Sequence, residues 1–120
     1  MKQYIRNLLI ALLAACLGSC GNLDDKSARE AVVRQIAADV GNGVQVEVIE
    51  MRRGEGDADN VYFLVDLRLT TLKNAEIAHG ALTGIVLYAA RPTVINGVTV
   101  LFQKQHSEQW KLTKYWQEKE

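Results

Sequence analysis

Residues 61–69 constrain the fold of this chain more than any other segment. Every odd-numbered position in it is apolar, whereas Asp66 and Arg68 occupy even-numbered positions. An alternation with a period of two is typical of a β-strand that buries one face against a core and exposes the other. The segment therefore predicts a half-buried strand, and the chain must supply another layer to cover its apolar face.

A second, shorter alternation precedes this strand. Valines alternate with polar residues over residues 44–48, and the pattern slips at Ile49 and Met51, which is where a β-bulge would place an extra residue. A polar segment, residues 54–60, separates the two alternating segments. The two strands are therefore predicted to form an antiparallel hairpin.

Residues 25–40 carry a helical pattern that supplies the covering layer. Apolar residues recur every fourth position, and Gly41 and Gly43 follow the last of them. Such a stripe indicates an amphipathic helix that ends at the glycines. Asp24 or Asp25 is expected to cap its start. The stripe consists of Ala28, Val32, Ile36 and Val40.

The second half of the chain is less uniform. Residues 75–90 are compatible with a helix or with a strand, because Gly80 and Gly84 weaken a helix while several β-branched residues favour a strand. Asn96 and Gly97 form a dipeptide that is typical of a tight hairpin turn. A strand over residues 98–104 is expected to pair with the segment before that turn.

The predicted fold class is α+β. One N-terminal helix packs on a curved antiparallel sheet of four to five strands, and a second helix at 75–90 is left open. This element order, together with the strand that contains Trp110, Lys111, Leu112 and Thr113, resembles cystatin-like and nuclear-transport-factor-like domains. The single opening helix departs from the multi-helix start of the transport-factor group.

The first nineteen residues have the pattern of a secretory signal peptide. Lys2 and Arg6 precede an almost wholly apolar run, residues 8–15, which is followed by small residues. That run is too short to span a bilayer. The predicted division of the chain is a signal peptide at 1–19, a lipidated cysteine with a short tether at 20–24, and one globular domain at 25–120.

The end of this segment resembles the lipobox of bacterial lipoproteins, which is a leucine, two small residues and a cysteine. The segments 17–20 and 13–16 both match it. The resemblance implies a diacylglyceryl group on the cysteine thiol and cleavage before that cysteine. Cys20 is the predicted attachment site and Cys16 the alternative, because Cys20 leaves a longer apolar core.

The same resemblance predicts a location in the cell envelope. Two or more acyl chains give stable membrane anchoring, so membrane lipid is a predicted partner. Because Gly21, not aspartate, follows Cys20, the protein is expected at the outer membrane, facing the periplasm, if its source has one. Residues 21–24 reach about 15 Å when extended, which keeps the domain close to the headgroups.

Charge and cysteine content exclude several functions. The chain has 14 basic and 14 acidic residues, and loss of Lys2 and Arg6 with the signal peptide leaves an acidic excess of two. Nucleic acid is therefore not a predicted partner. Both cysteines lie in the first twenty residues, so the domain has no internal disulfide, thiolate metal site or cysteine nucleophile.

No residue pattern predicts catalysis, a metal site or a cofactor. His79 and His106 are the only histidines and belong to no metal-ligand motif. Asp57 and Asp59 begin like a calcium loop, but the positions that need glycine and glutamate hold other residues. Cross-strand acids, namely Glu47, Glu50 and Asp66, are expected to pair with Arg52, Arg53 or Arg68 instead of forming a catalytic pair.

The last strand, residues 109–116, offers the only candidate interaction surface. Trp110 and Leu112 are expected in the core, whereas Tyr115 points outward and forms a partner patch with Trp116. The predicted function is accordingly that of a non-enzymatic, membrane-anchored lipoprotein that binds or supports another component of the envelope. The alternative is a small-ligand-binding domain that uses the concavity of the sheet, with an enzyme of that fold as a third hypothesis.

Overall fold

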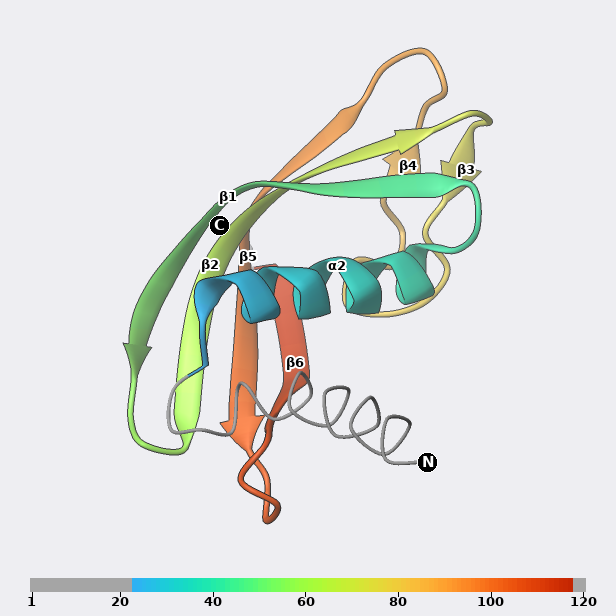
Figure 1. Ribbon diagram of the computed structural model, residues 1–120. Helices are drawn as coiled ribbons and strands as arrows, with labels where there is room; N and C mark the ends of the chain where they lie inside the picture. Colours follow the sequence, from blue (N-terminus) through green and yellow to red (C-terminus); the bar gives the residue numbers. More distant parts are fainter. Residues whose placement is uncertain (1–22, 118–120) are drawn as a thin grey trace, which may run out of the picture.

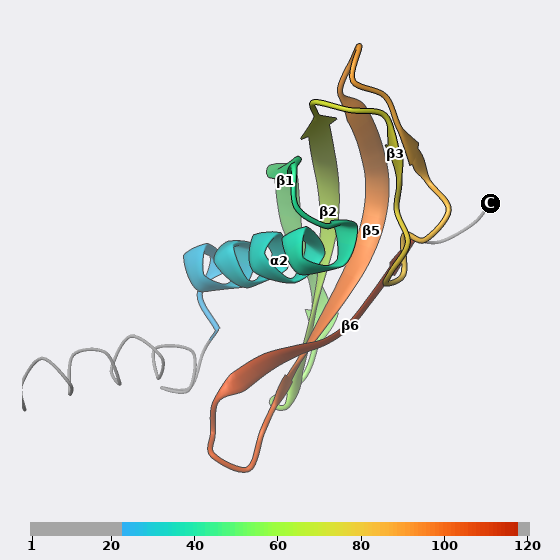
Figure 2. The same cartoon turned by 90° about the vertical axis from the view of Figure 1, so that its right-hand side faces the viewer.

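The computed structural model describes residues 23–117, in which one helix lies across the concave face of a curved antiparallel sheet (Figures 1 and 2). The sheet has four strands in the order β1-β2-β5-β6, and β3 pairs with β4 in a separate two-stranded sheet. The predicted α+β class is confirmed. The elements are α2 (Asp25–Val40), β1 (Val44–Gly56), β2 (Asn60–Thr71), β3 (Ala75–Glu76), β4 (Val86–Leu87), β5 (Thr93–Lys104) and β6 (Trp110–Gln117).

Helix α2 begins and ends where its sequence predicts. The Asp24 carboxylate accepts a hydrogen bond of 2.7 Å from the Ser27 backbone N–H, which satisfies one of the free donors of the first turn. At the other end, Gly41 has a φ of +98°, a conformation that glycine adopts without steric cost. Three residues of the predicted stripe are fully buried against the sheet: Ala28, Val32 and Ile36.

Arg53 attaches the start of this helix to the sheet. Its guanidinium donates to the Leu23 carbonyl at 2.5 Å and pairs with the Asp25 carboxylate at 2.8 Å. It also lies 4.9 Å from the centroid of the Phe63 ring. The side chain comes from β1, so two contacts hold the start of the helix against the sheet, and the third, with Phe63 of β2, positions the guanidinium.

Beta-bulges account for the curvature of the sheet. In the pairing of β1 with β2, Val48 is opposite Leu67 and Glu50 is opposite Asp66, so Ile49 is an extra residue. The bulge expected there from the sequence is confirmed. Further register shifts interrupt the pairing of β2 with β5 and of β5 with β6. Each extra residue bends its strand and increases the local twist, which wraps the sheet around α2 (Figure 2).

The hairpin predicted at Asn96 and Gly97 is wrong. Strand β5 runs through both residues, which together lie opposite Asp66 alone in β2. Gly97 has a φ of +75°, and its N–H donates to the Asp66 carboxylate at 2.9 Å. The same positive-φ preference that suits a tight turn also suits a bulge with glycine in the left-handed region, and the dipeptide forms the bulge here.

Residues 75–90 form neither a long helix nor a long strand. Two short strands, β3 and β4, flank a loop that hydrogen-bonds to itself: the Ile77 N–H donates to the Ile85 carbonyl at 2.9 Å. The helix left open for this segment is absent from the described residues. Apolar side chains from the segment nevertheless enter the core, and they are Ile77, Leu82 and Leu87.

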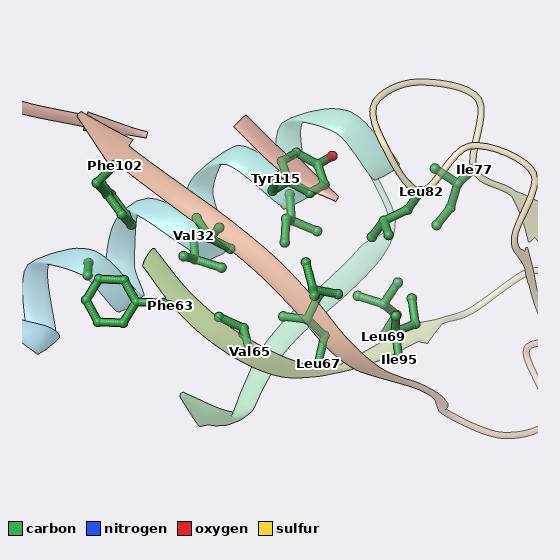
Figure 3. Packing of buried hydrophobic residues seen from close by; sticks show 14 of the residues in the cluster. Val32, Phe63, Val65, Leu67, Leu69, Ile77, Leu82, Ile95, Phe102 and Tyr115 are labelled. Atoms are coloured by element: carbon green, nitrogen blue, oxygen red, sulfur yellow. The ribbon is translucent and has the colours of Figure 1, made fainter. Parts of the chain in front are cut away.

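The core lies between α2 and the concave face of the sheet (Figure 3). Strand β2 contributes a residue at every second position, as its alternation predicts, and Phe63 meets Phe102 of β5 edge to face with ring centroids 5.7 Å apart. Val32 from the helix packs into the same cluster. This layer of apolar side chains determines which side chains of each strand remain on the outer, convex face.

Candidate functional site

A bulge in β6 determines which of its aromatic residues face outward. Leu101 of β5 is opposite Lys114, and Phe102 is opposite Leu112, so Thr113 is the extra residue. Before the bulge the even-numbered side chains of β6 face the core, and beyond it the odd-numbered ones do. Trp110 and Leu112 are partly buried against the core, as predicted, but Tyr115 now joins them on the inner face and Trp116 faces outward.

The prediction that Tyr115 points outward is therefore wrong. Its side chain is only 8% exposed, and its hydroxyl donates to the Asp39 carboxylate at the end of α2. The ring lies among the core residues (Figure 3). Burial raises the pKa of the Tyr115 hydroxyl well above its usual value, and the hydrogen bond to Asp39 raises it further. Tyr115 connects the sheet to the helix and is unavailable to a partner.

Removing this hydroxyl changes the response of the protein to alkali. The raised pKa of Tyr115 stabilises the fold fully below the tyrosine pKa of the unfolded chain, about 10, and the stabilisation is lost as the pH rises above that value. We expect Tyr115→Phe to lower the free energy of unfolding by about 1–2 kcal/mol at pH 7. Denaturant titrations between pH 7 and 11.5 measure the difference, which should shrink above pH 10. A constant difference would contradict this assignment.

An outer patch of apolar side chains lies on the convex face of the sheet. Tyr62 and Leu64 of β2 are each 36% exposed, although β2 is a central strand. Tyr62 is opposite Leu101 in β5, and Leu64 is opposite Thr99, which in turn is opposite Trp116 in β6. The outer face of such a sheet is normally polar, so neighbouring apolar groups on three strands are an interaction-site signal. We call Tyr62, Leu64, Leu101 and Trp116 the outer patch.

Charged side chains border the outer patch. The Lys114 ammonium lies 5.0 Å from the centroid of the Trp116 ring, and Arg52, opposite Leu64 in β1, pairs with Glu50 at 2.9 Å. An apolar centre with a charged rim is the usual composition of a protein–protein contact. The predicted patch thus keeps Trp116, loses Tyr115 and gains three residues. Tyr62 and Leu64 could have been found in the sequence, because they are apolar where the alternation expects polar residues.

A second surface feature is a groove of about 550 Å³ between α2 and β6. Apolar residues, including Phe102, Trp110 and Leu112, come from the sheet side, while Glu30 and Arg34 are among those from the helix. The groove exists because a single helix cannot cover the whole concave face. Its lining residues are Leu23, Ser27, Glu30, Ala31, Arg34, Gln35, Ala38, Phe102, Trp110, Lys111 and Leu112.

Three polar side chains that line the groove lack partners within the part of the chain that the structure describes, and they are those of Trp110, Glu30 and Arg34. The indole N–H of Trp110 is buried and makes no hydrogen bond there. The pairing of Glu30 with Arg34, which their four-residue spacing permits, does not form among residues 23–117. Buried donors are usually satisfied, and each exception calls for a physical explanation.

The remaining candidate residues are engaged in structural contacts or exposed singly. The expected cross-strand pairing of the acids is confirmed for Glu47, which pairs with Arg68 at 3.1 Å across β1 and β2. It is wrong for Glu50, which pairs with Arg52 of its own strand, and for Asp66, which accepts from the Gly97 N–H instead. The Asp57 carboxylate accepts from the backbone N–H groups of Asp59 and Asn60, and these hydrogen bonds lower its pKa. His79 and His106 are exposed. Among residues 23–117, no three His, Cys, Asp or Glu side chains are grouped so that they could hold a metal ion.

Comparison with protein families, curated proteins and solved structures finds no match for the chain. None of the helices in residues 23–117 has the length and apolar character needed to cross a membrane. The predicted signal peptide and both candidate lipidation sites, Cys20 and Cys16, lie outside the described residues.

Proposed function

We propose that this chain is a lipid-anchored protein of the bacterial cell envelope whose domain binds another envelope protein through the outer patch. The domain acts by binding, not by catalysis. Its proposed anchor is Cys20, and its proposed location is the outer membrane, facing the periplasm, in a source that has one. The anchor is supported by the lipobox-like segment 17–20 and by the charged and apolar segments before it.

The observation that carries the binding function is the exposure of Tyr62 and Leu64 on a central strand. These side chains do nothing for the core, because the opposite face of β2 already supplies the residues that pack against α2. Exposed apolar groups in a cluster favour aggregation unless a partner covers them. The aromatic residues Tyr62 and Trp116 are types that are enriched at protein interfaces.

Site-specific photo-cross-linking in cells tests the binding surface. A photoreactive amino acid at Leu64 or Trp116 should give one and the same protein adduct, because both positions lie under the proposed contact. Thr70 is the matched control, since it lies on the outer face of the same strand, β2, and outside the outer patch. The expected result is an adduct at Leu64 and Trp116 and none at Thr70.

Either of two cross-linking results would overturn the proposal. Adducts of the same abundance at Thr70 and Leu64 would show unspecific proximity, and no adduct at either patch position would show that the patch is uncovered in cells. Leu64→Lys then provides an independent check. Because Leu64 is outside the core, this substitution should leave the thermal unfolding temperature nearly unchanged and remove the adduct at Trp116.

A further inference from the structure

We propose that the groove between α2 and β6 binds an amphiphilic monocarboxylate, that is, a ligand with one apolar chain and one terminal carboxylate. The site lies on the concave side of the sheet, opposite the outer patch, and does not depend on the lipid anchor. It would give the domain a small-ligand function in addition to protein binding.

The walls of the groove suit an apolar chain. Phe102 and Leu112 are opposite each other on β5 and β6, and Trp110 follows on the same face of β6. Leu23, which is 4% exposed, closes the end at which the chain enters the domain, and Ala31 lines the helix side. Small and apolar side chains from three elements thus enclose a volume of about 550 Å³, within the range of small-molecule sites.

The polar groups of the groove suit a carboxylate. Arg34 projects from the exposed side of α2 and Lys111 lies at the rim on β6, and neither makes an ion pair within residues 23–117. A guanidinium binds a carboxylate through two parallel hydrogen bonds. The Trp110 N–H is buried and has no acceptor within residues 23–117, so a ligand that reached it would supply one. Among residues 23–117, Glu30 is the only acid that lines the groove.

Two other occupants are less suitable. A strand added to the free edge of β6 would meet the bulge at Thr113 and the side chains of Lys111 and Lys114, which are features that block edge pairing. The acyl chains of the protein's own proposed anchor have a better alternative, because burial in a bilayer stabilises them by about 0.8 kcal/mol for every methylene. The anchor's chains are attached to a cysteine and carry no free carboxylate for Arg34, so the proposed occupant is a separate molecule with a single chain.

The test uses the two tryptophans as reporters. The measurements use the chain that starts at Gly21, after dispersed amide resonances have shown that it folds. In this chain Trp116→Phe leaves Trp110 as the single tryptophan, and Trp110→Phe leaves Trp116, so that excitation selective for tryptophan reports on one site at a time. The probes are dodecanoate, dodecyltrimethylammonium and dodecyl maltoside, which share one tail and differ in head group. We expect saturable changes in Trp110 emission with dodecanoate alone, and no change in Trp116 emission with any probe.

Two arginines on the same helix provide the matched control. Arg34→Ala should weaken dodecanoate binding by roughly tenfold or more, because one charge-assisted contact is lost. Arg29→Ala, on α2 but outside the groove, should leave it unchanged. Both side chains are exposed, so both variants should fold. Equal binding of all three probes, equal losses for the two variants, or no response of Trp110 to dodecanoate would overturn the proposal. Binding reported by Trp116 would assign the ligand to the outer patch instead.

Discussion

Gly80→Ala should lower the free energy of unfolding by about 3 kcal/mol or more. Gly80 has a φ of +86°, which costs a residue with a side chain about 1 kcal/mol or more. A Cβ at this position would also collide with the Tyr115 hydroxyl and the Asp39 carboxylate. Because Tyr115 is buried and cannot move aside freely, the contact between sheet, helix and loop must open.

Gly84→Ala is the control that separates these two effects. Gly84 lies in the same loop with a φ of +96°, but a Cβ there would meet no atom within 4 Å. We expect it to cost only the backbone contribution, about 1–2 kcal/mol. Urea unfolding of both variants measures the difference. Equal losses of stability at Gly80 and Gly84 would show that the junction of Tyr115 with Asp39 is not tightly packed.

The sequence predicts those elements of the fold in which a single periodicity, helical or strand-like, continues along the whole element. The stripe of α2 repeats every fourth residue without interruption, and the odd-numbered positions of β2 are apolar from end to end. Each pattern requires one buried face, and the two faces cover each other. The bulge at Ile49 was predictable for the same reason, because the alternation of β1 visibly slips there.

The wrong predictions arise at β-bulges, where one extra residue moves the following side chains to the other face of the sheet and the sequence pattern gives no sign of it. Thr113 is an ordinary strand residue, so nothing in β6 marks it as a bulge, and Tyr115 is consequently assigned to the wrong face. Gly97 shows the converse problem. Its positive φ is correctly expected from the sequence, but a tight turn and a bulge use the same backbone conformation, and only pairing with β2 distinguishes them.

The candidate sites depend even more on contacts between distant segments. The outer patch consists of residues from β2, β5 and β6, and the groove is lined by residues from α2, β5 and β6. Both sites thus combine elements that are far apart in the sequence. The aromatic character of Trp110 and Trp116 draws attention to β6, but Arg34 resembles any other solvated helix residue in the sequence. Its proposed role rests on its place at the edge of an apolar groove without an ion-pair partner among residues 23–117, which local spacing cannot reveal.

Cys20→Ala should abolish both palmitate labelling and membrane retention of this protein, whereas Cys16→Ala should leave both intact. Residues 23–117 contain no helix that could cross a membrane, and the proposed diacylated cysteine would therefore supply the membrane affinity of the processed chain, so the expected loss is complete. Cells grown with a palmitate analogue and separated into membrane and soluble fractions give both readouts. A wild-type chain processed in parallel sets the upper limit of labelling.

The choice between the cysteines depends on the length of the apolar core before the cut. With Cys16 as the site, that core would be residues 8–13, which is shorter than the seven to fifteen residues of a usual secretory core. With Cys20 it extends through Ala15, and the cut leaves a polar start, with Gly21 and Asn22 after the cysteine. Arg53 then holds Leu23 against the sheet only three residues from the lipid. Loss of labelling in Cys16→Ala alone would place the anchor at Cys16 and lengthen the tether by four residues.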